Sequence, residues 1–181
     1  MDRLDDHESR WFALRTPNRH EKMAAKFLER EGVEYYLPLQ TVKREYKRKL
    51  VKRELCLLPC YIFARVVRAD VPKVYRNPYA NFLKIGSTRL DVPQQDIDLM
   101  RYITGDADLE WQPYTSNDWQ EGDLVELVGG SYTGLKGYFV EKKNKKQFVV
   151  TIESLSLAGS HPLVATVDSR YIIRPIKGKD E

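Results

Sequence analysis

The feature that most constrains this chain is a change in sequence periodicity near residue 119. Before it, apolar residues recur at helical spacing in two places, with short β-type runs between them. After it, short apolar runs alternate with glycines and the helical period is lost. Two periodicities in a chain of 181 residues indicate two small domains, a mixed helix-and-strand domain followed by an all-β domain.

The first part of the chain predicts strands alternating with helices. A strand over Trp11–Arg15 is followed by a helix with Thr16 as its N-cap, Pro17 at its first position and Gly32 as its left-handed end. The next strand covers residues 33–42 and is interrupted at Pro38. Further elements are expected as a strand over 61–67, a short helix over 70–76, a strand over 81–85 and a helix from Pro93 to Gly105.

The second part predicts a small β-barrel over residues 119–177. Its five expected strands are Asp123–Val128, Gly137–Lys142, Phe148–Ile152, Leu163–Val167 and Tyr171–Arg174. The β-branched run from Val149 to Ile152 favours strand over helix, so we expect this part to remain β-structure. Residues 106–118 fit neither period and are interpreted as a linker, and residues 1–9 as a flexible N-terminus.

The positive charge of the chain is concentrated in one segment. Residues 43–53 read KREYKRKLVKR, seven basic residues against the single acid Glu45, whereas the whole chain has a net charge of only +4. This pattern favours a local contact with a polyanion, and a solvated charged hairpin is the alternative. The candidate nucleic-acid contacts are Lys43, Arg44, Tyr46, Lys47, Arg48, Lys49, Lys52 and Arg53, with Tyr46 placed to stack on a base.

Motifs of catalysis and metal binding are not found in the sequence. Cys56 and Cys60 lack zinc or redox spacing and, on an extended strand, lie about 13 Å apart, too far for a disulfide. His7, His20 and His161 stand in unrelated contexts, without a nucleophile elbow or phosphate loop. We therefore expect a non-enzymatic protein without cofactor or metal. The lack of a membrane-length apolar run or signal peptide indicates a cytoplasmic protein, expected as a monomer.

Two stretches resemble known families. The C-terminal run GDLVELVGGSYTGLKGYFVE resembles a KOW motif, and the matching positions are Gly122, Asp123, Val125, Gly130, Gly134 and Gly137. In the N-terminal half, five features resemble the NusG N-terminal domain: Trp11 with LRT, a helix beginning near Glu21, the Tyr36-Leu37-Pro38 strand, residues 58–63 and residues 82–86. The resemblance implies an α+β protein: an N-terminal NusG-type α/β sandwich over residues 10–105 and a small C-terminal KOW β-barrel.

The resemblance implies a transcription elongation regulator that binds RNA polymerase, through the clamp helices of its large subunit, and promotes antitermination or alters pausing. The YYLP run and the basic stretch are most similar to RfaH-like and UpxY-like paralogues, which regulate specific operons such as capsular polysaccharide genes. The basic segment would then meet DNA of the elongation complex, including the non-template strand. The alternative is a KOW-type RNA- or ribosome-binding module without a polymerase role, which the small net charge of residues 119–181 disfavours.

The same resemblance implies two protein-binding surfaces. Aromatic residues at i and i+2 of one strand form a rigid anchor, or else they face the core. The implied polymerase contacts are Tyr61, Phe63, Tyr36, Pro59, Phe82 and Ile85. On the KOW domain, a barrel edge formed by Ile152, Leu155 and Leu157 matches the surface where relatives bind a small-subunit ribosomal protein or Rho, or it is a strand with nothing bound.

Overall fold

The computed structural model describes residue 4 and residues 7–106, 108–114, 122–142, 144–160, 162–168 and 170–176. The chain divides into two compact units. Unit 1 contains residues 1–39, 58–101 and 153–159, and unit 2 contains residues 40–57, 102–152 and 160–181. Both units are therefore discontinuous in sequence, in contrast to the predicted division near residue 105.

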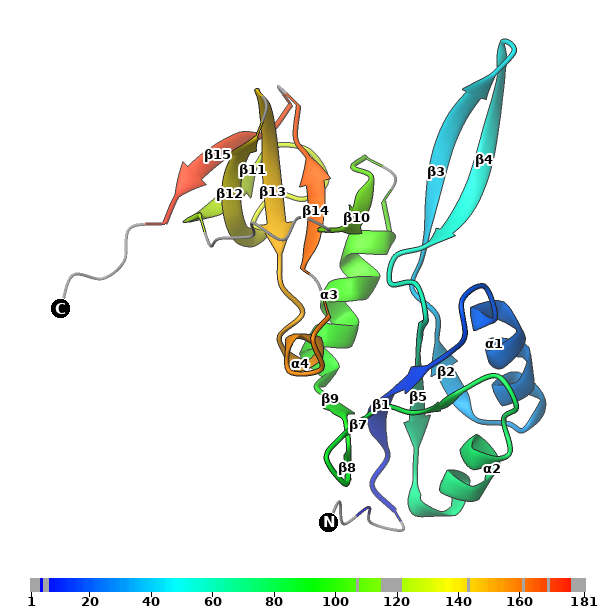
Figure 1. Ribbon diagram of the computed structural model, residues 1–181. Helices are drawn as coiled ribbons and strands as arrows, with labels where there is room; N and C mark the ends of the chain where they lie inside the picture. The colour runs from blue at the N-terminus through cyan, green and yellow to red at the C-terminus, as the bar shows by residue number, and fades with distance from the viewer. Residues whose placement is uncertain are drawn as a thin grey trace, which may run out of the picture. The chain divides into compact units, whose positions relative to one another are not determined.

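Unit 1 is built on an antiparallel sheet with the strand order β2-β5-β1-β6, and β9 also pairs with β1 (Figure 1). A separate two-stranded hairpin consists of β7 and β8. The bounds are β1 Arg10–Arg15, β2 Glu34–Tyr36, β5 Tyr61–Val66, β6 Asn81–Phe82, β7 Lys84–Ile85, β8 Thr88–Arg89 and β9 Asp91–Val92.

Helices lie on both faces of this sheet. On one face, Leu28 of α1 and Val74 of α2 share an apolar core with Phe12 and Leu14 of β1. On the other face, the Trp11 indole donates a hydrogen bond to the Gln94 side chain of α3 at 2.9 Å. The sandwich predicted for the N-terminal part is thus present. The helices are α1 Glu21–Arg30, η1 Arg68–Asp70, α2 Val71–Tyr75, α3 Gln94–Thr104 and α4 Glu153–Ser156.

The helix start that Thr16 and Pro17 predict is wrong, because α1 begins at Glu21, where the family resemblance places it. The backbone N–H of Thr16 instead donates to the Cys60 carbonyl at 2.9 Å, which extends the pairing of β1 with β5. The buried Glu21 carboxylate accepts a hydrogen bond from the Cys60 backbone N–H at 2.8 Å. The predicted end is confirmed, since Gly32 has a φ of +69°.

Unit 2 contains a six-stranded antiparallel sheet with the order β10-β14-β13-β12-β11-β15 (Figure 1). All five strands expected here are present, with ends shifted by up to three residues. This sheet is compatible with the predicted barrel, and β10 and β15 are its edges. The bounds are β10 Trp111–Pro113, β11 Asp123–Val128, β12 Lys136–Lys142, β13 Lys145–Val150, β14 Leu163–Thr166 and β15 Ile172–Pro175.

The edge strand β10 lies inside residues 106–118, so the expectation of a linker there is wrong for this part. Trp111 is opposite Ala165 of β14, and its side chain is 1% exposed between the rings of Tyr132 and Phe148. A three-residue strand is too short to show a period in the sequence, so its burial was not predictable from pattern. Residues 107 and 115–118 of the expected linker, and residues 1–3, 5 and 6 of the expected N-terminal segment, lie outside the described residues.

Candidate functional site

The basic segment forms the hairpin β3 (Leu39–Tyr46) and β4 (Lys49–Cys56), which among the described strands is a two-stranded sheet of its own (Figure 1). Its turn consists of Lys47 and Arg48, with φ values of +45° and +66°. Every residue from 43 to 55 is exposed, and the Tyr46 side chain is 70% exposed. The basic segment therefore forms an exposed hairpin.

The two faces of this hairpin differ in charge. Because the turn has two residues, Tyr46 lies opposite Lys49, and alternate residues point to opposite faces. One face, called the cationic face below, has three cations, one aromatic ring and no acid. The other face has two cations and two acids. The cationic face consists of Arg44, Tyr46, Lys49, Val51 and Arg53, and the opposite face of Lys43, Glu45, Leu50, Lys52 and Glu54.

Arg44 differs from the other predicted nucleic-acid contacts because its guanidinium already forms an ion pair within the protein. Its two terminal nitrogens donate to the two carboxylate oxygens of Glu110, at 2.7 and 2.5 Å. These hydrogen bonds raise the pKa of Arg44. The structure therefore gives Arg44 a structural partner and leaves Tyr46, Lys47, Arg48, Lys49 and Arg53 as the exposed group on the cationic face and the turn.

The residues predicted to contact polymerase do not form one patch. Phe63 is fully buried and Tyr61 is 8% exposed, so the core-facing alternative describes both side chains. Phe82 packs with Leu14 in the core beneath α1 and α2, whereas Phe63 is opposite Ala13 and so points to the other face of the sheet. Sequence alone gives no register between distant strands, so this separation was not foreseeable.

Three predicted contacts remain accessible in unit 1. Tyr36 is half-buried, and its ring stacks on Phe63 with centroids 6.2 Å apart. The Arg101 guanidinium lies 5.2 Å from the centre of the same Tyr36 ring. Pro59 and Ile85 are exposed. Phe63 thus supports an accessible aromatic ring from below.

The KOW-like glycines occupy close approaches and turns in unit 2. A Cβ on Gly137 would lie 2.4 Å from the Val149 carbonyl oxygen, so only glycine fits between β12 and β13 there. Gly130 has a φ of +60°, and a Cβ there would meet the Tyr171 ring at 2.6 Å. The other motif positions are the close-approach glycine Gly122, the exposed Asp123, the buried Val125 and the turn glycine Gly134, whose φ is +89°.

The stretch IESLSL was expected as a barrel edge, and this is wrong. Residues 153–156 form α4, which belongs to unit 1, where the Ser154 N–H and hydroxyl donate to Asp96 Oδ2 at 3.1 and 2.5 Å. Ile152 and Leu155 are buried, and only Leu157 is exposed, at 75%. The pairing of Ser154 with Asp96 across 58 residues has no local sequence signal.

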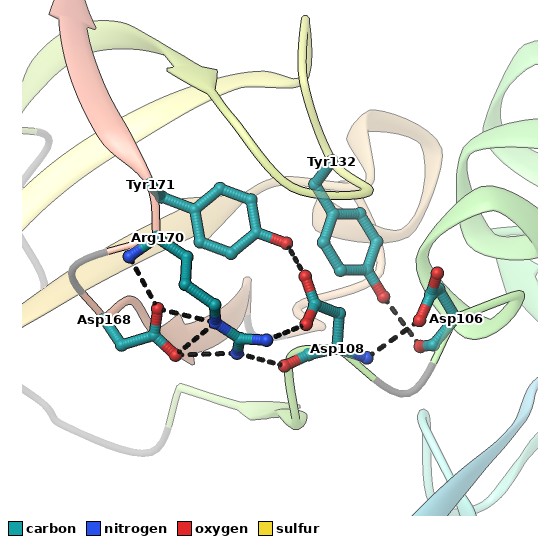
Figure 2. Close-up of polar contacts among 6 residues, drawn as sticks. All are labelled: Asp106, Asp108, Tyr132, Asp168, Arg170 and Tyr171. Carbon is teal, nitrogen blue, oxygen red and sulfur yellow. Dashed lines mark hydrogen bonds and ion pairs between the residues drawn. The ribbon is translucent and has the colours of Figure 1, made fainter.

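A polar cluster in unit 2 was also missed by sequence reasoning. Figure 2 shows Arg170 and Tyr171 pointing at the Asp108 carboxylate, to which both donate hydrogen bonds. Arg170 also forms an ion pair with Asp168 at 2.7 Å. The hydroxyl of Tyr132 lies 2.8 Å from the Asp106 carbonyl oxygen. These contacts join Asp106 and Asp108 to the turn between β11 and β12 and to the segment before β15, so this part of the expected linker packs on unit 2.

The cluster shifts the ionisation of its members. The hydrogen bond from Tyr171, with the charge of Arg170, holds the pKa of Asp108 below its usual range. Burial raises the pKa of Tyr132 to about 12. Burial and the bond to Asp108 raise the pKa of Tyr171. The cluster therefore favours an ionised Asp108 beside neutral tyrosines.

Other kinds of site receive no support in the part of the chain that the structure describes. There, His, Cys, Asp and Glu side chains never gather in a group of three that could hold a metal ion. Cys56 and Cys60 are half-buried and not joined in a disulfide. Among the described helices, none has the length and apolar character needed to cross a membrane.

The fold defines a mixed α/β protein of two sheet-containing units with an exposed basic hairpin. The family model described as "Transcription termination factor nusG" matches residues 9–101. The structure entitled "Domain interaction in Thermotoga maritima NusG" is similar with a TM-score of 0.58 and 18% identity over 96% of this chain and 100% of that chain. A chain from the "MjSpt4:Spt5 complex conformation B" is 18% identical over 94% of this chain and 99% of that chain, with a TM-score of 0.29. None of the curated proteins matches.

The chain belongs to the NusG family, because the family model covers more than half of its residues. It is therefore a transcription factor of a family that regulates transcription elongation, and the members of that family are not enzymes.

Proposed function

We propose that this protein binds elongating RNA polymerase through unit 1 and touches the nucleic acid of the elongation complex with the cationic face of its basic hairpin. The proposed contact with nucleic acid rests on the unequal distribution of charge between the two faces of the hairpin. Lys49 and Arg53 share a face with the exposed Tyr46 ring and with no acid. A ring that can stack on a base beside cations that meet phosphates is the usual composition of a single-strand contact.

The turn of the hairpin supports the same proposal. A two-residue turn with both φ values positive favours Asn-Gly, because side chains are strained in this region. Here the positions hold Lys47 and Arg48. Left-handed backbone at a residue other than glycine costs of order 1–3 kcal/mol and is concentrated at functional sites. Two cations at the tip therefore fit a binding role better than a stabilising one.

The nucleic-acid contact is tested with two charge-matched variants of the full chain. Lys49→Gln with Arg53→Gln removes two cations from the cationic face, and Lys43→Gln with Lys52→Gln removes two from the opposite face. With single-stranded DNA as the probe, we expect the first variant to reduce the salt slope of binding by about 1.4, or 0.7 for each lost phosphate contact. The control should change it far less. Equal reductions would mean that the hairpin acts only through its total charge.

The polymerase contact is proposed around the accessible ring of Tyr36, with Pro59 and Ile85 as further exposed apolar residues of unit 1. Tyr61 and Phe63 are proposed to support this surface from within. Tyr36→Ala in the full chain should weaken binding to core polymerase by about 2 kcal/mol or more if the ring is an interface anchor. Met23→Ala, which truncates an exposed apolar residue of α1, is the control. Equal affinities of the two variants would place the interface elsewhere.

The finer role is also a proposal. We infer an RfaH-like or UpxY-like factor that holds the clamp helices, meets the non-template strand and promotes antitermination of specific operons, such as capsular polysaccharide genes, in the cytoplasm. The unit 2 sheet is proposed as the KOW domain, with a small-subunit ribosomal protein or Rho as its partner. Of the three partner residues proposed, only Leu157 is exposed. Transcription in vitro on templates with and without the leader of a capsular operon would test this, because a general pausing factor would act equally on both.

A further inference from the structure

The base of the basic hairpin is bound to the edge strand β10 by the Gln40 side chain. Gln40 Oε1 accepts the Trp111 backbone N–H at 3.0 Å, and Gln40 Nε2 donates to the Trp111 carbonyl oxygen. The Gln40 side chain is buried. One amide side chain thus satisfies both backbone groups of a strand residue, as a neighbouring strand would.

The backbone of β10 explains why these two groups are available. The Tyr114 N–H bonds to the Pro162 carbonyl oxygen at 2.7 Å, so Tyr114 points its backbone groups towards the β14 side. Strand residues alternate in direction, so Trp111 and Pro113 point theirs outward. Pro113 has no N–H that needs a partner there. Gln40 therefore covers both outward backbone groups of Trp111, and the Pro113 carbonyl is the other outward acceptor of β10.

A second contact holds the hairpin four residues further along β3. Arg44 and Glu110 form the bidentate ion pair described above, and Glu110 directly precedes Trp111. Gln40, Val42 and Arg44 lie on one face of β3, and Val42 between the two contacts is buried. Two contacts about 13 Å apart along a strand restrain both its position and its direction. An isolated two-stranded hairpin is only marginally stable in water, so the hairpin depends on these two contacts to keep its position and direction.

We propose that Gln40 and Glu110 are positioning residues, through which β10 sets the direction of the hairpin and presents its cationic face to nucleic acid. The anchored face of β3 is the face that, beyond Arg44, holds Tyr46. The six-stranded sheet therefore orients the ligand-binding part of the hairpin from its base. This inference rests on the proposed nucleic-acid role of the hairpin.

Residual dipolar couplings of the full chain test the restraint without any ligand. We expect amides of the hairpin, residues 43–53, to share one alignment tensor with amides of the six-stranded sheet. Gln40→Ala with Glu110→Ala should remove this agreement, and Gln112→Ala, which changes an exposed side chain of β10, should preserve it. A hairpin that is independent of the sheet in the wild type, or that follows it unchanged in the double variant, would overturn the proposal. If the double variant does not fold, the same couplings are measured on Glu110→Ala alone, because this substitution is at an exposed site.

Binding of single-stranded DNA then separates positioning from direct contact. Gln40→Ala removes no charge, so we expect a 3- to 10-fold weaker affinity, about the cost of ordering a loosened segment, with an unchanged salt slope. Lys49→Gln, in contrast, should lower the slope. Wild-type affinity in a Gln40→Ala variant whose hairpin has come loose would overturn the positioning role. A wild-type protein with a restrained hairpin that binds no DNA would instead refute the proposed function.

Discussion

The basic hairpin and the six-stranded sheet of unit 2 are both antiparallel β-structure, but they are stabilised in opposite ways. In the sheet, Trp111, Tyr132 and Phe148 are buried ring against ring, and the polar contacts of Figure 2 join the chain before β10 to the segment before β15. The hairpin beyond Val42 has no buried side chain before Cys56, and it has left-handed residues at its turn. Substitutions in the sheet should therefore act mainly on stability, and those in the hairpin mainly on binding.

The largest expected difference is between two aromatic truncations. Trp111→Ala removes a fully buried ring and should lower the free energy of unfolding by about 3–5 kcal/mol. Tyr46→Ala removes an exposed ring and should change it by less than about 0.5 kcal/mol, while weakening binding to single-stranded DNA by about 1–3 kcal/mol. Urea unfolding and DNA titration of both variants measure this. A large loss of stability in Tyr46→Ala would contradict the view that the hairpin ring acts in binding and not in folding.

A smaller effect is expected from the polar cluster. Asp108→Asn removes the ionised acceptor of Arg170 and Tyr171 and should destabilise the protein by about 1–3 kcal/mol at pH 7. Because the pKa of Asp108 is lower in the folded than in the unfolded state, its contribution is complete above about pH 4 and is lost as the pH falls through the folded value. The two proteins should therefore converge in stability at acidic pH. Glu141→Gln, at an exposed site on β12, is the control for the removal of a surface carboxylate.

The same cluster predicts a loss of stability in alkali. The pKa of Tyr132 is raised to about 12, above an unfolded value near 10. Its contribution is complete below about pH 10 and is lost as the pH rises towards 12. Tyr132→Phe has no ionisable group there, so its unfolding midpoint should fall less over this interval. Parallel curves for the two proteins would exclude Tyr132 as the cause.

The smallest expected change concerns the hairpin turn. Lys47→Asn with Arg48→Gly should relieve strain and raise the stability of the hairpin by about 1 kcal/mol, measured as slower amide exchange in β3 and β4. The same variant should bind single-stranded DNA with a lower salt slope, because two cations are lost. If the variant gains stability but its DNA binding keeps the wild-type salt slope, the cations of the turn are solvated and do not contact phosphates.

Sequence patterns predicted the strands of unit 2 and singled out the basic segment that forms the hairpin, because alternation along a strand and a run of charge are local signals. They failed where a partner is distant. Trp111 sits in a strand too short to show a period, and Asp108 meets Arg170 62 residues later in the chain. Helix α4 was mistaken for a strand because four residues do not distinguish the two periods. The separation of Phe63 from Phe82 depends on register, which no single strand encodes.

The placement of α4 also bears on how the chain is made. Residues 153–159 belong to unit 1, so this unit is incomplete on the ribosome until most of unit 2 has been synthesised. The hairpin likewise emerges long before Glu110 and Trp111 can hold it. A fragment that stops at residue 105 would lack the Ser154 partner of Asp96, and it would leave the buried amide of Gln40 without its backbone partners. During vectorial synthesis, the nascent chain must therefore present its most basic segment before the strand that restrains it exists.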